Sequence, residues 1–291
     1  MRADRMRKFA VMGSLLMLLT GNVQAQEDCD AAARLIQQAD QITPLAARLN
    51  DYLQARSLCP GDAKVHYRSG LALMASARYT EAHTAFLDAM ERATQQHLPP
   101  TMRMEIMGRL AENDYRSNDR PKALLGFKVA SDFARKHQMV LPDWVLALQK
   151  DMDQQLDKRP LSADELRAAL RSMRDLGVES SVDYRVLFEF DRDQPTAEGL
   201  AQLQQIAEAL QQSDTPRIEV IGHTDVRGKA AYNRALSERR AQRVVALLIQ
   251  TAPALKGHLY PSGKGMSQPK YPGNTPEDHQ LNRRVEFVFG R

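Results

Sequence analysis

The stretch IGHTDVRGKAAYNRALSERRA, residues 221–241, decides how the second half of this 291-residue chain folds. An apolar run that ends at Gly222 gives way to a polar turn and then to apolar residues at helical spacing, which predicts a strand, a turn and a helix. The stretch also places an acid, Asp225, fifteen residues before an arginine, Arg240. Such a pair is either a surface ion pair, which contributes little, or part of a pocket for a ligand that carries both charges.

The segments around this stretch alternate between strand and helix patterns. Strands are expected at 184–190, 217–222, 257–265 and 283–290, with one helix through 200–210 and another that begins at about Asn233. Strands that alternate with helices imply crossover connections. We therefore expect an α+β domain of order β-α-β-α-β-β, with a mixed sheet and its helices on one face.

The first half of the chain, residues 27 to about 157, is rich in Ala, Leu, Gln and Arg and has no β-rich run, so it is expected to be all helical. Gly70, Ala82, Phe86 and Ala89 stand at helical spacing. Small residues at Gly70 and Ala82 would let two antiparallel helices approach closely, and Phe86 would fill the space between neighbouring hairpins. These four residues resemble the Gly, Ala, Phe and Ala positions of the tetratricopeptide repeat.

Two further copies can be aligned with this one. The preceding copy, 34 residues earlier, has Tyr52, Ala55 and a closing Pro60, but Arg48 at a small-residue position. The following copy, displaced by 41 residues, has Ala111, Ala123, Phe127 and Ala130. A last helix is expected to present one apolar stripe, made of Trp144, Leu148, Met152 and Leu156. An unclassified helical bundle is the alternative to tetratricopeptide-like repeats.

The chain opens with a basic segment, residues 1–8. An apolar run of 13 residues follows, and then a small-residue cleavage site after Ala25. This is the pattern of a cleavable signal peptide, whereas an uncleaved anchor needs about 20 apolar residues. We expect export to the periplasm and no transmembrane span in the mature protein, with outer-membrane association left open. The first 25 residues hold four basic residues and one acid, so the net charge of +4 falls to about +1. That charge gives no basis for nucleic-acid binding.

The two cysteines, Cys29 and Cys59, both follow the signal segment. In an oxidising compartment paired cysteines usually form a disulfide. Residues 26–28 are not the small residues that lipid attachment requires, so we expect no lipidation. In the repeat frame Cys29 opens the first helix of the first hairpin and Cys59 closes the second helix, so antiparallel packing brings them together. Two buried thiols are the alternative.

A polar break at 156–160 precedes one more helix, in which Ser162 and Glu165 stand at capping-box spacing. The domains expected are a signal peptide at 1–25, a tetratricopeptide-like domain at 26–157, a helical linker at 158–181 and the second domain at 182–291.

The second domain contains, in order, VLFEFDRDQ, a GHTD turn, an N-x-x-L-S-x-x-R-A helix start and an NRR strand. On these motifs it resembles, over about 184–291, the OmpA-like domain, the peptidoglycan-anchoring module of bacterial envelopes. The resemblance implies non-covalent binding of the diaminopimelate side chain of the uncrosslinked stem peptide. It assigns the contacts to Asp225, Arg240 and Asn233, to main-chain groups around Thr224, and a supporting role to Arg283.

The chemistry of this ligand fits those residue types. Diaminopimelate ends in a head with an ammonium and a carboxylate. Asp225 can accept from the ammonium, and Arg240 can hold the carboxylate in a bidentate fork that lysine cannot supply. Asn233, Ser237 and Arg240 stand at i, i+4 and i+7 and share one helix face. The structural alternatives are an N-cap for Asn233, a turn cap for Asp225, a sheet edge for Arg283, turn support for His223 and a solvated face for Arg239 and Arg243.

We therefore expect a non-enzymatic envelope protein that binds peptidoglycan and recruits an envelope protein through its helical repeats. No metal or cofactor is expected. One alternative is an enzyme of wall turnover, but the histidines in 26–180, namely His66, His83, His97 and His137, have no metal-ligand spacing. Another alternative, a flagellar-type stator, requires an uncleaved membrane span.

Overall fold

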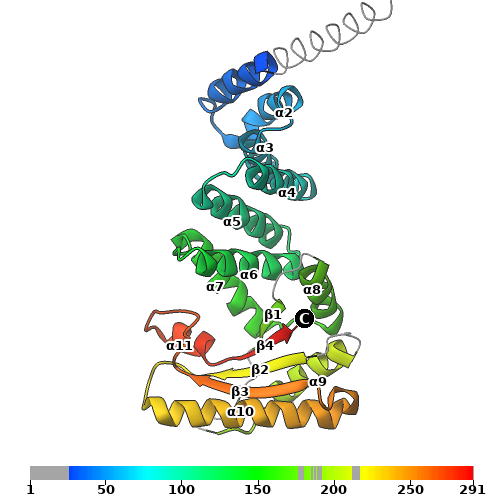
Figure 1. Ribbon diagram of the computed structural model, residues 1–291, viewed down its shortest axis with the longest axis vertical. Helices are drawn as coiled ribbons and strands as arrows, with labels where there is room; N and C mark the ends of the chain where they lie inside the picture. Colours follow the sequence, from blue (N-terminus) through cyan, green and yellow to red (C-terminus); the bar gives the residue numbers. More distant parts are fainter. Residues whose placement is uncertain are drawn as a thin grey trace, which may run out of the picture. The chain divides into compact units, whose positions relative to one another are not determined.

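The computed structural model describes residues 26–175, 180–184, 186, 188, 192–211 and 217–290 (Figure 1). The predicted signal peptide lies outside these residues. By contacts the chain divides into two compact units, one of residues up to 118 with 133–140, and the other of residues 119–132 and 141–291. Within the described ranges, no helix combines the length and the apolar character that a membrane crossing requires.

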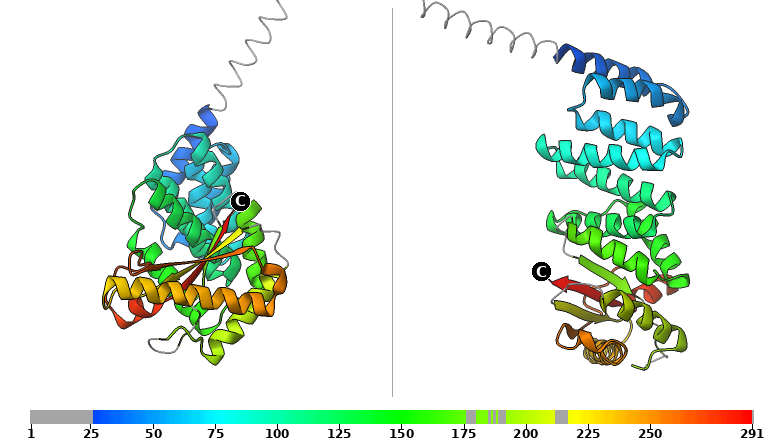
Figure 2. Two further views of the ribbon diagram at one scale, coloured as in Figure 1. Left: turned by 60° about the horizontal axis from the view of Figure 1, so that its bottom comes forward. Right: turned by 90° about the vertical axis from the view of Figure 1, so that its right-hand side faces the viewer.

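The first unit is helical throughout its described residues, as expected (Figure 2). After a helix at 26–39 come η1 (Leu45–Arg48), α2 (Leu49–Leu58), α3 (Ala63–Ala75), α4 (Tyr79–Gln95) and α5 (Pro100–Arg116). Asp62 caps α3 because its side chain accepts from the backbone N–H of Lys64 and Val65. The helices α3 and α4 form a hairpin, and α4 packs in turn against α5.

The α3–α4 hairpin is built around the contact between Gly70 and Phe86. A Cβ atom on Gly70 would lie 2.7 Å from the ring of Phe86, so the ring lies directly on the backbone of α3. Leu49 and Leu110, from the helices before and after the hairpin, pack against the same buried cluster. This confirms the expected close approach of the two helices, with Phe86 packed between α3 and α4.

Most of the equivalent positions of the other two aligned copies are also buried, whereas Arg48 is half-buried. Each of the following is at most 1% exposed: Tyr52, Ala55, Ala111, Ala123, Phe127 and Ala130. In the second unit, α7 (Asp143–Lys158) buries Val145, Gln149 and Met152. Trp144 and Leu148 are half-buried, so the buried face of α7 is offset from the predicted stripe.

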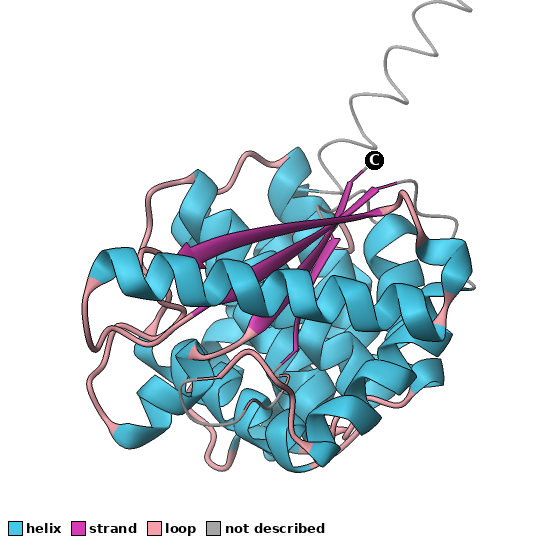
Figure 3. Cartoon of the chain, turned by 90° about the horizontal axis from the view of Figure 1, so that it is seen from below, coloured by secondary structure: helices cyan, strands magenta, loops and turns pink. Residues whose placement is uncertain are grey.

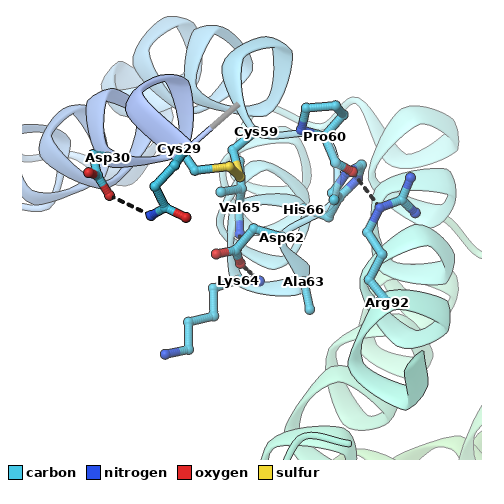
Figure 4. Close-up of a disulfide and its surroundings, with 12 residues drawn as sticks. Cys29, Asp30, Cys59, Pro60, Asp62, Ala63, Lys64, Val65, His66 and Arg92 are labelled. Atoms are coloured by element: carbon cyan, nitrogen blue, oxygen red, sulfur yellow. Dashed lines mark hydrogen bonds between the residues drawn. A yellow bond between two sulfur atoms is a disulfide. The ribbon is translucent and has the colours of Figure 1, made fainter. Parts of the chain in front are cut away.

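Cys29 and Cys59 form a disulfide, as predicted (Figure 4). Cys29 lies in the helix at 26–39 and Cys59 directly follows α2, so the bond joins the start of one helix to the end of a later one. Ala32, Ala55 and Val65 form the buried cluster around the two cysteines. The bond therefore closes the first pair of helices over a small apolar core.

The second unit contains a four-stranded mixed sheet of order β1-β4-β2-β3. Its strands are β1 (Ser180–Tyr184), β2 (Arg217–His223), β3 (Leu259–Gly265) and β4 (Val285–Gly290). Strand β4 is antiparallel to β1 and β2, whereas β2 and β3 are parallel. This confirms the expected mixed sheet.

Two features of the sheet domain differ from the predicted order. The first strand ends at Tyr184 instead of beginning there, and Phe188 makes only an isolated bridge with Pro195, while part of the predicted 184–190 strand lies outside the described residues. The predicted β-β ending is wrong, because α11 (Pro276–Asn282) lies between β3 and β4. A capping box between Thr275 and Asp278 starts this short helix.

The α7 and α8 helices belong to the same compact unit as the sheet. The predicted capping box begins α8 (Ala163–Asp175), because Glu165 N donates to Ser162 Oγ (3.2 Å) and Ser162 N donates to Glu165 Oε2 (2.8 Å). On α7, Lys150 Nζ donates to the buried Asp278 of α11 (2.6 Å) and lowers the pKa of that carboxyl group. Helix α7 therefore helps to hold α11 in place.

Helix α10 (Ala230–Thr251) packs against β2 and β3, with α9 (Ala197–Gln211) beside it (Figure 3). A Cβ atom on Gly222 would lie 2.2 Å from the carbonyl oxygen of Ser237, so the two backbones touch. Ser237 Oγ accepts from the N–H of Gly265 (2.9 Å), and Glu238 accepts from the N–H of Gly263 (2.7 Å). These contacts fix the first half of α10 on the carboxyl ends of both strands.

Loss of the Cys29–Cys59 bond is expected to destabilise the first unit. The bond spans 30 residues, and closing a loop of that size contributes on the order of 3 kcal/mol in the chain-entropy model. Denaturant unfolding with and without reductant measures the effect, and the Cys29→Ser, Cys59→Ser double variant is the control that should not respond to reductant. An unfolding midpoint that is the same with and without reductant would contradict the prediction.

The Gly222→Ala substitution is expected to destabilise the second unit by about 1–3 kcal/mol or more, because the methyl group overlaps the Ser237 carbonyl. Gly61→Ala is the control, since a Cβ atom there meets nothing within 4 Å. Its effect should stay within about 0.5 kcal/mol. Equal unfolding free energies for the two variants would show that the Gly222 contact is not close-packed.

Candidate functional site

The candidate site begins where β2 ends. His223 N donates to the carbonyl of Arg284 (2.9 Å), and Thr224 N donates to the carbonyl of Gly265 (3.0 Å), so neighbouring segments hold the chain on both sides. The register between β2 and β3 shifts between Gly222 and His223. Asp225 therefore lies just after the end of β2, in the turn that leads into α10.

Asp225 is 6% exposed, and its carboxylate accepts four hydrogen bonds from two arginines. Its Oδ1 accepts from the backbone N (3.1 Å) and Nε (3.2 Å) of Arg227. Its Oδ2 accepts from Nη2 of Arg227 (2.8 Å) and Nη1 of Arg283 (2.8 Å). Burial raises the pKa of Asp225, but these donors outweigh burial and hold the pKa well below its usual range. Asp225 is therefore a carboxylate at neutral pH.

Arg240 lines a cavity of about 100 Å³. It is 8% exposed, its Nε donates to the carbonyl of Arg192 (3.0 Å), and its guanidinium carbon lies 4.8 Å from the ring centroid of Phe188. The ring thus makes a cation–π contact with Arg240. Apolar and basic side chains share the lining, which consists of Val186, Phe188, His223, Arg240, Gln280, Arg283 and Arg284.

This cavity suits a small anionic head group. Its volume is several times the ~10–15 Å³ that a cavity needs to hold one water molecule. Three arginines contribute to its wall, and a guanidinium recognises a carboxylate by charge and by paired hydrogen bonds. Among the described residues that line it, none is acidic, and Asp225 is not one of them.

Arg283 links the two residues that the sequence singled out. It lines the cavity together with Arg240, and it also donates to Asp225. The hydrogen bonds that the structure describes for Asp225 go to Arg227 and Arg283. Arg283 therefore contacts both the cavity and the Asp225 carboxylate.

Asn233 and Thr224 support the same turn. The N-cap alternative for Asn233 is wrong, because Lys229 is the N-cap of α10 and Asn233 lies in its first turn. Asn233 Nδ2 donates to the carbonyl of Arg227 (2.7 Å), which ties the turn to the helix. The hydroxyl of Thr224, itself 5% exposed, has no hydrogen-bond partner among the described residues.

The shared helix face is present as predicted. Asn233, Ser237 and Arg240 are all buried on α10, although Ser237 serves the contact with β3 rather than the cavity. His223, expected to support the turn, also lines the cavity, and its Nε2 lies 3.3 Å from a carboxylate oxygen of Glu286.

Sequence reasoning missed three parts of the site. Arg227 was given no role, although its two-residue spacing from Asp225 allows an acid–base contact within a turn. Phe188 lies in the VLFEF run that was assigned to a strand, so its contact with Arg240 was not anticipated. Gln280 belongs to α11, whose only sequence signal was the Thr-Pro-Glu-Asp capping pattern.

The comparisons with known proteins concern this part of the chain. Residues 187–283 match the model of the OmpA family. The outer-membrane lipoprotein YfiB of Pseudomonas aeruginosa is 35% identical over 117 residues, which cover 40% of this chain and 68% of that protein. The peptidoglycan-associated lipoprotein of Legionella pneumophila is 34% identical over 103 residues, which cover 35% of this chain and 58% of that protein.

Among solved structures, the peptidoglycan-associated lipoprotein from Burkholderia pseudomallei is 28% identical and matches 40% of this chain and 98% of that one, with a TM-score of 0.33. The chain belongs to the OmpA family. It spans between 30% and 68% of the length of five curated relatives, and the family match begins at residue 187. In the described ranges, no group of three His, Cys, Asp or Glu side chains is arranged to hold a metal ion.

Asp225→Asn is expected to destabilise the protein in a pH-dependent way. A carboxyl group whose pKa is lower in the folded state contributes stability above its unfolded pKa of about 3.9 and loses that contribution as the pH falls toward the folded pKa. The difference in unfolding free energy between wild type and variant should therefore be constant above about pH 5 and shrink below about pH 4. Denaturant unfolding across this range measures it, and a difference that grows on acidification would contradict the account.

Proposed function

We propose that this protein is a non-enzymatic component of the bacterial cell envelope that binds peptidoglycan non-covalently through its second unit. The observation that carries the proposal is the arginine-lined cavity next to the charged Asp225. A head group with both a carboxylate and an ammonium complements that pair of charges. The name of the Legionella relative, a peptidoglycan-associated lipoprotein, supports the same ligand.

In this proposal Arg240 binds the carboxylate of the diaminopimelate head. Its Nε donates to the Arg192 carbonyl and its guanidinium carbon lies over the Phe188 ring, so the orientation of the guanidinium is set before the ligand arrives. Such preorganisation lowers the entropic cost of binding. Arg283 supplies a second positive charge on the cavity wall.

Asp225 binds the ammonium group, and the segment before α10 completes the site. The Thr224 hydroxyl is a buried group that a polar ligand atom can satisfy. Asn233 holds the carbonyl of Arg227 and thus keeps the turn in its shape. A lysine side chain in place of diaminopimelate would lack the carboxylate that Arg240 binds, so the wrong ligand would bind less tightly.

The helical residues 26–157 are proposed to recruit a protein partner in the envelope. The Gly70–Phe86 contact and the buried residues of the aligned copies support tetratricopeptide-like repeats, which expose extended surfaces for partners. The proposal also includes removal of residues 1–25 on export to the periplasm. It places the partner-binding repeats within 26–157, a bracing segment at 158–181 and the ligand site within 182–291.

Binding to purified sacculi tests the proposed function. The assay compares the wild type with Arg240→Ala and with Arg239→Ala, a matched control because the adjacent Arg239 is exposed. Removal of one partner of a buried charge pair costs about 2–5 kcal/mol, so Arg240→Ala should bind more than tenfold less tightly while Arg239→Ala retains wild-type binding.

Asp225→Asn should also weaken binding, and sacculi with lysine in place of diaminopimelate should bind poorly to the wild type. Full binding by Arg240→Ala would remove the site assignment. Release of soluble wall fragments by the wild-type protein would instead support the alternative of a wall-turnover enzyme.

A further inference from the structure

We propose that Arg227 is a built-in competitor of the ligand: its side chain occupies the positions on Asp225 that the ligand's ammonium takes, and it leaves when the ligand binds. The inference rests on the proposed function, because it names the event that opens the ammonium half of the same site. It concerns a residue to which the family resemblance assigned no role.

The Asp225 carboxylate has a limited number of acceptor positions. A carboxylate offers about four lone-pair positions, two on each oxygen. At Asp225, two positions on Oδ1 are taken by the backbone N and Nε of Arg227, and two on Oδ2 by Nη2 of Arg227 and Nη1 of Arg283. An ammonium group therefore reaches Asp225 only by replacing a donor that is already present.

The donor that can leave is the Arg227 side chain. It is 62% exposed, whereas the Arg283 side chain is 40% exposed and forms part of the cavity wall with Arg240. An ion pair with an exposed partner contributes little net free energy, because water competes for both groups. Release of Arg227 into solvent is accordingly less costly than release of Arg283 from the wall.

The backbone of the turn need not move during this exchange. The backbone N–H of Arg227 donates to Asp225, and its backbone carbonyl accepts from Asn233 Nδ2. Both backbone polar groups of Arg227 therefore stay bonded when the side chain moves. Departure of the side chain frees one position on Oδ1 and one on Oδ2. An ammonium has three donors on one nitrogen and can bridge those two positions.

Competition of this kind makes a specific prediction about ligands. Removal of the competitor strengthens binding only for ligands that place an ammonium on Asp225. A ligand that engages the cavity through its carboxylate alone does not displace Arg227 and gains nothing. The presence of the free amine on the ligand therefore separates competition from a general change in surface charge.

Calorimetric titration of the protein that spans residues 26–291, without the predicted signal peptide, tests the inference. The probe is the stem tripeptide that ends in diaminopimelate, and the proteins are wild type, Arg227→Gln and Lys229→Gln. Lys229 lies in the same turn and is exposed, so its variant removes the same charge without touching Asp225. Arg227→Gln should bind roughly three- to fivefold more tightly than wild type, the equivalent of an exposed ion pair, and Lys229→Gln should stay within about twofold of wild type.

The titration is repeated with the tripeptide acetylated on the side-chain amine of diaminopimelate. For this ligand, Arg227→Gln should show no gain in affinity over the wild type. Weaker or unchanged binding of the unmodified tripeptide by Arg227→Gln would overturn the inference, because it would make Arg227 a ligand contact or a bystander. So would an equal gain for Lys229→Gln. If the wild type and both variants all fail to bind the tripeptide, the proposed function fails and the inference fails with it. If the wild type binds and Arg227→Gln does not, only the inference fails.

Discussion

The contact between the backbone of α10 and the glycine-rich ends of β2 and β3 determines the geometry of the candidate site. Gly222 lies against the carbonyl of Ser237, and the N–H groups of Gly263 and Gly265 bond to side chains of the same helix. Any side chain at Gly222 would push the helix away from the sheet. Because Arg240 projects from α10 and Asp225 follows β2, the relative position of the two charges depends on this close approach.

The charge distribution of the site is set by the Asp225 carboxylate and the arginines around it, which α10, β2 and β3 hold in place. One buried carboxylate is surrounded by arginines, and the cavity beside it is lined by basic and apolar side chains. The arginines lower the pKa of Asp225 despite its burial, so the acid remains charged without a ligand. The turn thus holds opposite charges at short range, and Arg283 belongs both to the carboxylate's environment and to the cavity wall.

Sequence patterns predicted the parts of this structure that local periodicity encodes. The strand, turn and helix of 221–241 and the buried face of α10 depend on spacing alone, and the Cys29–Cys59 bond follows from the ends of antiparallel helices. The seven-residue α11 is too short for helical periodicity to detect, so only its capping residues signalled it. The fork of Arg227 on Asp225 depends on a side-chain conformation in a turn, which no spacing rule specifies.

The central claim is that Asp225 and Arg240 bind the two charges of one diaminopimelate head group. A crystal structure of the protein with a diaminopimelate-containing stem peptide tests this claim most directly. The account predicts the ligand carboxylate in the cavity against Arg240, the ammonium on Asp225 and the Arg227 side chain turned to solvent. A ligand bound elsewhere on the second unit, with Arg227 still forked on Asp225 and the cavity free of ligand, would contradict it.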